Sequence, residues 1–340
     1  LKTDPLYKYQ WHLNNTGQTN FASNAGTSGI DLNIDTVIAS GIDGDGITVA
    51  VVDSGLELTH EDLAVNIVAN KSYDYEDNDN DPAPTGSTGD HGTSVAGIIA
   101  AVGWNNKGGR GVAPNASLVG NNAQSASLNS TGMSDALGGN ISGYFDPSDI
   151  DIFNMSFGTV LNSAFPVVIS STYEAGLLNG VTNLRSGKGA IYINSAGNDW
   201  YEVDGSVKYC GPNYGTGAYS DLFPCWDSSF DKIYATPYII GVASLNADES
   251  KSIYSTPGSS VWVSGFGGDT GNNTSHTGAS YVGGNKPAIM TVDQSSCSKG
   301  YTKSGVSVGS GQNYNAFNNA DHSENNSCNY ASTFNGTSSA

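Results

Sequence analysis

Short apolar runs alternate along this chain with segments in which apolar residues recur every three or four positions. The run ITVAVVD at Ile47–Asp53 is rich in β-branched residues and ends abruptly in polar ones, as a buried strand does. The segment HGTSVAGIIAAV at His91–Val102 has helical spacing, and its small residues allow close packing on a sheet. The same patterns predict strands at Ala116–Gly120, Asp149–Ser156, Gly189–Asn198 and Tyr238–Ser244, and a helix at Phe165–Leu184. This alternation predicts an α/β fold with a central parallel sheet and right-handed crossovers.

The pattern changes at Gly265, and from there to Asn335 the sequence is dominated by Gly, Asn and Ser with few periodic apolar positions. Such a long stretch without regular structure is unusual in a compact domain. We therefore expect functional or calcium-bound loops in this part of the chain. We find neither an internal repeat nor a linker that would separate two domains.

The charge of the chain excludes several classes of partner. The 340 residues include 13 Lys and Arg against 32 Asp and Glu, for a formal net charge of -19. Such a surface repels nucleic-acid phosphates and anionic lipids, and it attracts metal ions and basic peptides. No apolar run approaches the roughly 20 residues that a membrane span needs. The sequence therefore predicts no nucleic-acid partner and no membrane partner.

Four cysteines, Cys210, Cys225, Cys297 and Cys328, lie in Gly-rich segments and form no CxxC pair. An even number in such segments favours two disulfides over a zinc or redox site. Proximity in the sequence favours the pairs Cys210–Cys225 and Cys297–Cys328, although other pairings stay open. These features predict a secreted, acidic protein.

Polar residues with catalytic potential stand at predicted strand and helix ends. Asp53 ends one strand, His91 opens a helix, Asn198 ends another strand, and Ser338 lies in the final segment FNGTSSA. Taken singly, each fits a turn, a cap or a solvated tail. Together, the order Asp, His, Ser is one of those known for a catalytic triad. A serine hydroxyl needs a base to accept its proton, a carboxylate to orient that base, and a donor to meet the oxyanion.

Six motifs occur in one order across residues 47–340: VVDSGLELTHEDL, DHGTSVAGIIA, GVAPNASL, NMSFG, SAGN and NGTSSA. This arrangement resembles the subtilisin superfamily of serine proteases. The segments TDPLYKYQWHLNNTG and YDYEDNDNDPAPTGSTGDHGTS are more similar to the kexin and proprotein-convertase branch, especially its secreted bacterial members. The resemblance implies a three-layer fold with helices on both faces of the sheet, and a triad of Asp53, His91 and Ser338. It also implies that Asn198 and the Ser338 N–H bind the oxyanion.

The same resemblance implies a bound Ca²⁺, for which hard oxygen ligands are suited. The implied ligands are side chains of Asp4, Asp62 and Asn105 with backbone carbonyls of Val102, Lys107 and Gly109. The alternative is that these are ordinary polar loop residues. A second acidic run, at residues 74–81, is interpreted as a solvated loop.

Substrate recognition is implied for the strand end Ser156-Phe157-Gly158, which in the family pairs with the substrate backbone. The following TVLN lacks the acidic residues that kexin-like members use to bind Arg or Lys, whereas Asp204 and Asp227 fit the branch. A glutamate that the branch uses for a further calcium falls on Thr256. We expect a preference for Arg or Lys before the scissile bond.

The resemblance also predicts partners and the extent of the domain. Family members act on protein or peptide substrates, are made as zymogens with a propeptide, and associate with inhibitors or chaperones. They continue after the nucleophile into a buried helix, and kexin-like members add a β-sandwich domain. We therefore expect residues 1–340 to be an incomplete catalytic domain, with the remainder of its own chain as a further partner. A proteolytically silent binding protein of the same fold is the alternative function, and a calcium-dependent adhesin is disfavoured because no repeat is present.

Overall fold

The computed structural model describes residues 3–84, 91–124, 128–158, 168–198, 227–271, 286–305 and 315–340. Its elements, in chain order, are η1 (Tyr7–Tyr9), α1 (Asp35–Ala39), β1 (Thr48–Asp53), β2 (Tyr73–Asp74), α2 (His91–Ala100), β3 (Ser117–Asn122), α3 (Ser130–Ser134), η2 (Asp135–Gly139), β4 (Ile152–Met155), α4 (Ser171–Gly187), β5 (Ile191–Ser195), η3 (Ser228–Phe230), α5 (Lys232–Ala235), β6 (Ile239–Leu245), β7 (Val261–Phe266), β8 (Ile289–Val292), η4 (Ala316–Asn318) and β9 (Tyr330–Phe334). Within these described ranges, no helix is long and apolar enough to cross a membrane.

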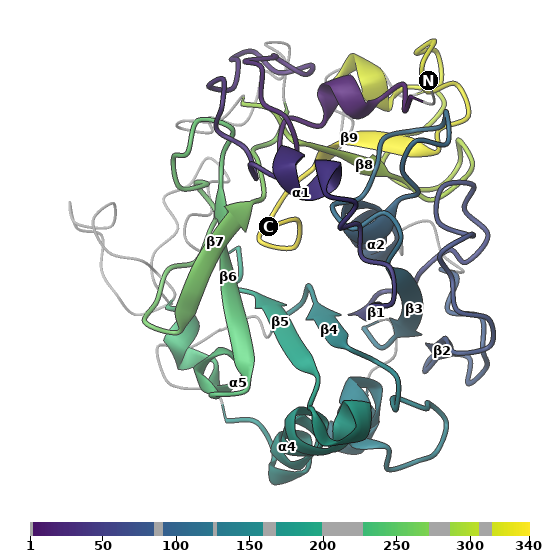
Figure 1. Cartoon of the computed structure of the whole chain (residues 1–340), viewed down its shortest axis with the longest axis vertical. Helices are drawn as coiled ribbons and strands as arrows, with labels where there is room; N and C mark the ends of the chain where they lie inside the picture. Colours follow the sequence, from purple (N-terminus) through teal and green to yellow (C-terminus); the bar gives the residue numbers. More distant parts are fainter. Residues whose placement is uncertain are drawn as a thin grey trace.

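The central feature is a seven-stranded sheet with the order β2-β3-β1-β4-β5-β6-β7 (Figure 1). Every neighbouring pair in it is parallel. Each of the five strands and two helices predicted from alternating patterns up to Ser244 is present, with ends that differ by up to six residues. The predicted α/β fold with a parallel sheet is confirmed. Its consequence is that all carboxyl ends of the sheet strands lie at one edge, where a site can form.

Apolar side chains cover both faces of the sheet and form two separate cores. On one face, Ala50 and Val52 of β1 pack with Phe153 of β4 and with Leu177 of α4. On the other face, Val49 and Val51 pack with Val95 and Ala96 of α2 and with residues of β8 and β9. Alternate residues of one strand therefore serve opposite layers, as the period of two requires. This arrangement confirms the predicted three-layer fold.

The segment between Gly265 and Asn335 contains more regular structure than its sequence suggested. Strands β8 and β9 form an antiparallel pair that packs beside α2. Both are short, four and five residues, and polar loops surround them, so no clear period-two signal stands out. Our expectation of a long stretch without regular structure was therefore wrong for these two strands.

Polar side chains and a disulfide hold the loops around β9. Cys297 and Cys328 are bonded, with their Cα atoms 5.1 Å apart, which confirms that predicted pair. Asn325 is buried, donates to the carbonyl of Tyr330 at 2.7 Å and accepts from its N–H. Its amide thus takes the place of a strand partner for the β9 backbone. The predicted pair Cys210–Cys225 lies outside the described residues.

Candidate active site

Asp53 and His91 meet where β1 ends and α2 begins. His91 Nδ1 lies 2.8 Å from Asp53 Oδ1, and the Asp53 side chain is fully buried. The same carboxylate oxygen accepts the N–H of Ser54 at 2.7 Å. A carboxylate on Nδ1 holds the imidazole as the tautomer whose Nε2 accepts a proton. The pair can therefore supply an oriented general base.

Glycine 92 makes this approach of helix to strand possible. A Cβ at Gly92 would lie 2.2 Å from the carbonyl oxygen of Gly55 and 2.8 Å from Cβ of Asp53. No larger residue fits at this position without moving the backbone of α2 away from β1. The residue after the histidine thus sets the distance between base and carboxylate.

Ser338 lies in a turn from Gly336 to Ser339, in which the Ser339 N–H donates to the Gly336 carbonyl at 3.1 Å. Gly336 has a φ of +105°, a conformation that favours glycine. The Ser338 hydroxyl donates to the carbonyl of Ser156 at 3.3 Å, and the Ser156 hydroxyl donates to the Ser338 carbonyl at 3.2 Å. These two bonds place the predicted nucleophile against the end of β4.

Asn198 follows β5 and contacts the same turn. Its side-chain carbonyl accepts from the Thr337 N–H at 2.8 Å and from the Thr337 hydroxyl at 3.0 Å. Because the oxygen is occupied in this way, the amide NH₂ is the end that can donate to a ligand. Across the described residues, neither Asn198 Nδ2 nor the Ser338 N–H donates a hydrogen bond. Both donors are thus available to an incoming oxyanion.

The four predicted catalytic residues come together at the carboxyl edge of the sheet. The yellow C-terminal segment that carries Ser338 lies beyond the arrowheads of β4 and β5 in Figure 1. The His91 ring also packs against Phe334 of β9, with ring centroids 5.3 Å apart. No hydrogen bond joins His91 to Ser338 in the part of the chain that the structure describes. Catalytic contacts of this kind often tighten only when substrate binds.

The predicted substrate-binding residues differ in how the structure places them. Phe157 and Gly158 border a pocket of about 530 Å³ whose wall also includes Met133, Tyr173 and Ile233. Asp227 caps η3 by accepting the Ser229 N–H at 2.8 Å. Thr256 is buried, and its N–H donates to the carbonyl of Gly197 at 2.9 Å, next to Asn198. Asp204 lies outside the described residues.

Asp4, Asp62 and Asn105 of the predicted calcium site meet beside the end of α2. The Asp4 carboxylate accepts the N–H groups of Trp104 and Asn105, and the Asn105 amide donates to Asp62 Oδ1 at 2.6 Å. Asp62 is fully buried, and its Oδ2 has no hydrogen-bond partner among the described residues. Burial, with the negative charges of Asp4 and Glu61, raises the pKa of Asp62 to about 7 although the Asn105 bond lowers it.

This orphaned carboxylate oxygen fits a cation ligand, because an unpaired buried oxygen is costly without one. The three backbone contributors line the same loop: the Val102 N–H donates to the Asp62 carbonyl, the Lys107 N–H donates to Asn105 Oδ1, and Gly109 lies against Gln10. Within the described ranges, no group of three or more His, Cys, Asp or Glu side chains could hold a metal ion. The predicted set contains two carboxylates and relies on amide and carbonyl oxygens for the rest.

Comparison with known proteins identifies the family. The family model described as Subtilase family matches residues 44–340. The chain belongs to the subtilase family. The predicted subtilisin-like relationship is thereby confirmed, and the parallel sheet with helices on both faces agrees with it.

The relatives extend this result. The "Aeromonas extracellular serine protease" of Aeromonas sobria is 33% identical over 99% of this chain and 50% of its own length. The "Dibasic-processing endoprotease" of Schizosaccharomyces pombe is 33% identical over 59% of this chain and 26% of its own. A crystal structure of the Aeromonas sobria serine protease with the chaperone ORF2 has a TM-score of 0.81 at 31% identity, over 99% of this chain and 52% of that one. The chain thus spans about half the length of the Aeromonas protease and about a quarter of the Schizosaccharomyces protein.

Two contributors to this site were absent from the sequence interpretation. Thr337 fixes the orientation of the Asn198 amide, and Tyr254 accepts the N–H of Gly336 at 2.9 Å. The role of Thr337 could have been inferred from its position directly before Ser338 in the sequence. Tyr254 lies 82 residues from Gly336 and gives no sequence signal of that contact.

Proposed function

We propose that this subtilase is a serine endopeptidase in which Ser338 is the nucleophile, His91 the base and Asp53 the residue that orients it. The observation that carries the proposal is the hydrogen bond between buried Asp53 and His91 at the same sheet edge as the Ser338 turn. An oriented base beside a serine is the arrangement that acyl transfer requires.

The steps of the proposed peptide-bond cleavage are transfers of one proton between Ser338, His91 and the leaving amine. The Ser338 hydroxyl turns from the Ser156 carbonyl toward His91 Nε2, gives up its proton and attacks the substrate carbonyl. Asp53 stabilises the imidazolium that forms, and His91 then passes the proton to the leaving amine. Water repeats the sequence on the acyl-enzyme and releases the acid.

The oxyanion of the tetrahedral intermediate would be met by the Asn198 amide and the Ser338 N–H. Support comes from Thr337, which occupies the Asn198 oxygen and leaves its NH₂ to donate. Donors that are fixed before the reaction need no reorganisation when negative charge develops on the oxygen. Electrostatic stabilisation of this kind is usually the largest single contribution to catalysis.

The substrate would bind as an extended peptide along Ser156, Phe157 and Gly158, with one side chain in the adjoining pocket of about 530 Å³. Its wall combines apolar residues such as Met133 and Ile233 with polar ones such as Gln124, so it can take a side chain with an apolar stem and a polar end. A preference for Arg or Lys before the scissile bond is supported by Asp227, by the net charge of -19, and by the printed name of the dibasic-processing relative.

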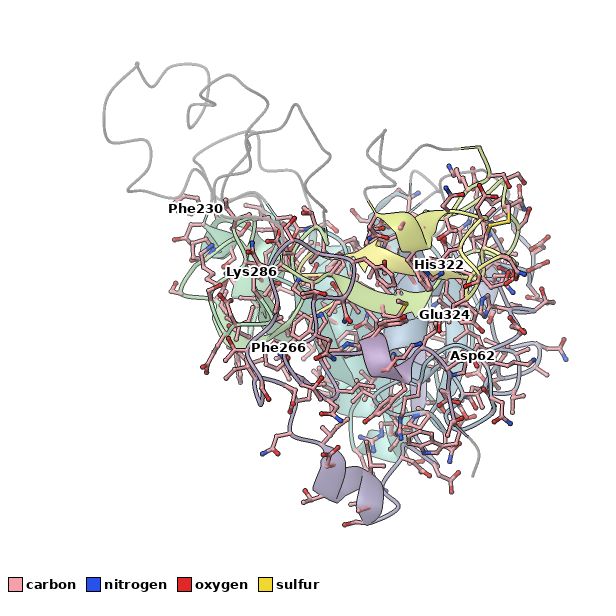
Figure 2. The ribbon with its side chains drawn as sticks, turned by 90° about the horizontal axis from the view of Figure 1, so that it is seen from above. Asp62, Phe230, Phe266, Lys286, His322 and Glu324 are labelled. Carbon is pink, nitrogen blue, oxygen red and sulfur yellow. A yellow bond between two sulfur atoms is a disulfide. The ribbon has the colours of Figure 1, made fainter. Side chains whose placement is uncertain are left out.

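A Ca²⁺ bound by Asp4, Asp62 and Asn105 would neutralise the buried carboxylates and hold the loop after α2. Chelation should then lower the thermal midpoint of the whole protein. The free energy of unfolding should fall by up to about 3 kcal/mol if calcium is present at a hundred times its Kd. Calorimetry with and without chelator measures this, and Asp62→Asn should abolish most of the difference. Equal midpoints with and without chelator would count against the ion. Figure 2 shows Asp62 and Phe230 of η3 on opposite sides of the molecule. We assign the ion a structural role because its proposed ligands include none of the proposed catalytic residues.

We also propose a setting for the enzyme. The confirmed Cys297–Cys328 disulfide and the extracellular Aeromonas relative support secretion. The relative that was crystallised with a chaperone supports a chaperone or propeptide partner. The remainder of the protein's own chain is proposed to complete the domain around Ser338.

A fluorophosphonate tests the proposal because it forms a covalent adduct with an activated serine. Mass analysis of the full natural protein should show one adduct on Ser338, lost in Ser338→Ala and in His91→Ala. A peptide series that varies only the residue before the scissile bond then tests the preference for Arg and Lys. A folded protein that gives no adduct and cleaves no peptide would instead be a silent binding protein of this fold.

A further inference from the structure

The backbone of the Ser338 turn depends on a tyrosine hydroxyl that belongs to a different part of the chain. Tyr254 Oη accepts the N–H of Gly336 at 2.9 Å and donates to the carbonyl of Gly268 at 2.6 Å. Ser244 Oγ lies 3.0 Å from the same oxygen. Because the single hydroxyl proton goes to Gly268, the other two contacts are ones in which Tyr254 accepts. The hydroxyl is therefore fully used.

This hydroxyl joins three backbone segments at the carboxyl edge of the sheet. Ser244 lies in β6, Gly268 follows β7, and Gly336 begins the turn that carries Ser338. The anchor is itself supported, because Ser252 Oγ lies 2.8 Å from Ser244 Oγ and 3.1 Å from the Gly268 carbonyl oxygen. A second bond from the turn, Ser339 Oγ to the Gly267 carbonyl at 3.2 Å, reaches the same segment.

The burial and backbone conformation of Gly336 leave its N–H few alternative hydrogen-bond partners. Gly336 is buried with a φ of +105°, so its N–H cannot be solvated without moving the turn. A Cβ at Gly267 would lie 2.3 Å from the Gly336 carbonyl oxygen, which shows how closely the turn rests on that segment. The next two residues along the chain are Thr337, which fixes Asn198, and Ser338, which carries the nucleophile.

We propose that Tyr254 is a positioning residue for the reaction: its hydroxyl fixes Gly336, and through that turn it aligns the Ser338 nucleophile with the Asn198 amide. This inference rests on the proposed function. Tyr254 touches no reacting atom; it acts through the backbone that presents them. Loss of the hydroxyl leaves the substrate-binding strand end in place and displaces the donors that act in the transition state.

The test uses Tyr254→Phe in the full natural protein, which removes one oxygen and keeps the ring. Concentrations of competent sites are set by fluorophosphonate titration, so that misfolded enzyme is not counted. We expect kcat per titrated site to fall about tenfold to a hundredfold while KM stays within about twofold. Hydrogen exchange measured by mass spectrometry on peptides from residues 334–340 should show faster exchange at Gly336.

A pH profile separates this role from a change in protonation. Burial raises the pKa of Tyr254 to about 12, so its hydroxyl stays protonated over the working range of the enzyme. The ratio of wild-type to Tyr254→Phe kcat should therefore be constant between about pH 6 and 10.

Tyr192→Phe is the matched control. The Tyr192 hydroxyl is buried and donates to the Leu137 carbonyl at 2.6 Å, on the face of the sheet covered by α4. Its loss should lower the thermal midpoint without altering kcat per site or exchange at Gly336.

The outcomes divide cleanly. Unchanged exchange at Gly336 in Tyr254→Phe, or an unchanged kcat per site, overturns the positioning role. Equal losses of kcat in both tyrosine variants also overturn it, because general stability would then explain the effect. A wild-type protein that fails to react with the fluorophosphonate refutes the proposed function instead, and the exchange measurement still decides whether Tyr254 holds the turn.

Discussion

The two halves of the candidate site are held in place by different forces. Asp53 and His91 stand at the ends of β1 and α2, between apolar cores that bury both faces of the sheet. Ser338 and Asn198 stand in turns, where Thr337, Ser156 and Tyr254 hold them through hydrogen bonds. Apolar burial is non-directional, whereas a hydrogen bond fixes both distance and direction. The acid–base half, Asp53 and His91, is thus held mainly by apolar packing. The nucleophile half, Ser338 and Asn198, is held by a network of hydrogen bonds.

The largest effect on kcat should come from a substitution in the acid–base half. Asp53→Asn keeps the shape of the side chain but offers an N–H to His91 Nδ1, which selects the wrong tautomer. We expect kcat to fall about 10⁴-fold with little change in KM, measured on a chromogenic peptide. Asp135→Asn is the control, since this buried carboxylate belongs to η2 and accepts from Ser142 and Tyr75. A similar loss of kcat in both variants would mean that folding, and not the tautomer, is affected.

In the nucleophile half, loss of the oxyanion donor should cost about 10²- to 10³-fold in kcat for Asn198→Ala. Thr337→Val should cost less, because it removes the hydroxyl bond to the Asn198 oxygen and keeps both the backbone N–H bond to that oxygen and the amide donor. Steady-state kinetics on one peptide measures both. Equal losses of kcat would show that the orientation of the Asn198 amide matters as much as its presence. A Thr337→Val enzyme at full activity would show that the Thr337 hydroxyl does not help to hold the nucleophile half.

The disulfide that supports the nucleophile half should contribute to stability and little to the chemistry. Cys297 and Cys328 are 31 residues apart, and closing a loop of that size restrains the unfolded chain by about 3–4 kcal/mol. The double Cys→Ser variant should unfold at lower denaturant with kcat per titrated site unchanged at 25 °C. A fall in kcat per site would show that the loop also sets the geometry of β9 and the turn beyond it.

The smallest expected effect is a dependence of stability on pH that comes from His12. Trp11 donates to the Ala288 carbonyl at 2.8 Å, and the adjacent His12 is buried, with neither ring nitrogen hydrogen-bonded among the described residues. Burial lowers the pKa of His12 from 6.5 to about 4. The unfolded chain therefore takes up the proton first, so stability is lost as pH falls from about 6.5 towards 4, by up to about 3 kcal/mol.

Denaturant unfolding at pH 7, 5.5 and 4 measures this loss, and His12→Leu should flatten the His12 contribution without changing the slope above pH 7. Parallel curves for the two proteins would show that other groups control the acid limb.

The comparison also explains what the sequence could predict. Strand β1 and helix α2 carry strong periodic patterns, and Asp53 and His91 stand at their ends, so local rules placed them. Ser338 was placed by its family motif alone, because nothing in its local pattern separates it from a polar tail. Tyr254, Asn325 and strands β8 and β9 were missed because their roles depend on contacts between distant segments. Directional polar contacts leave little periodic trace in a sequence.

The 182 residues that separate Ser156 from Ser338 have a consequence for how the protein is made. At the usual pace of about 5–20 residues per second, a ribosome needs about 10–40 s to add that length of chain. During this interval the nascent chain already contains the aspartate and the histidine, and it lacks the hydroxyl that they would activate. The site is assembled across translation, so a complete triad exists only after Ser338 has been synthesised and its turn has docked against the end of β4.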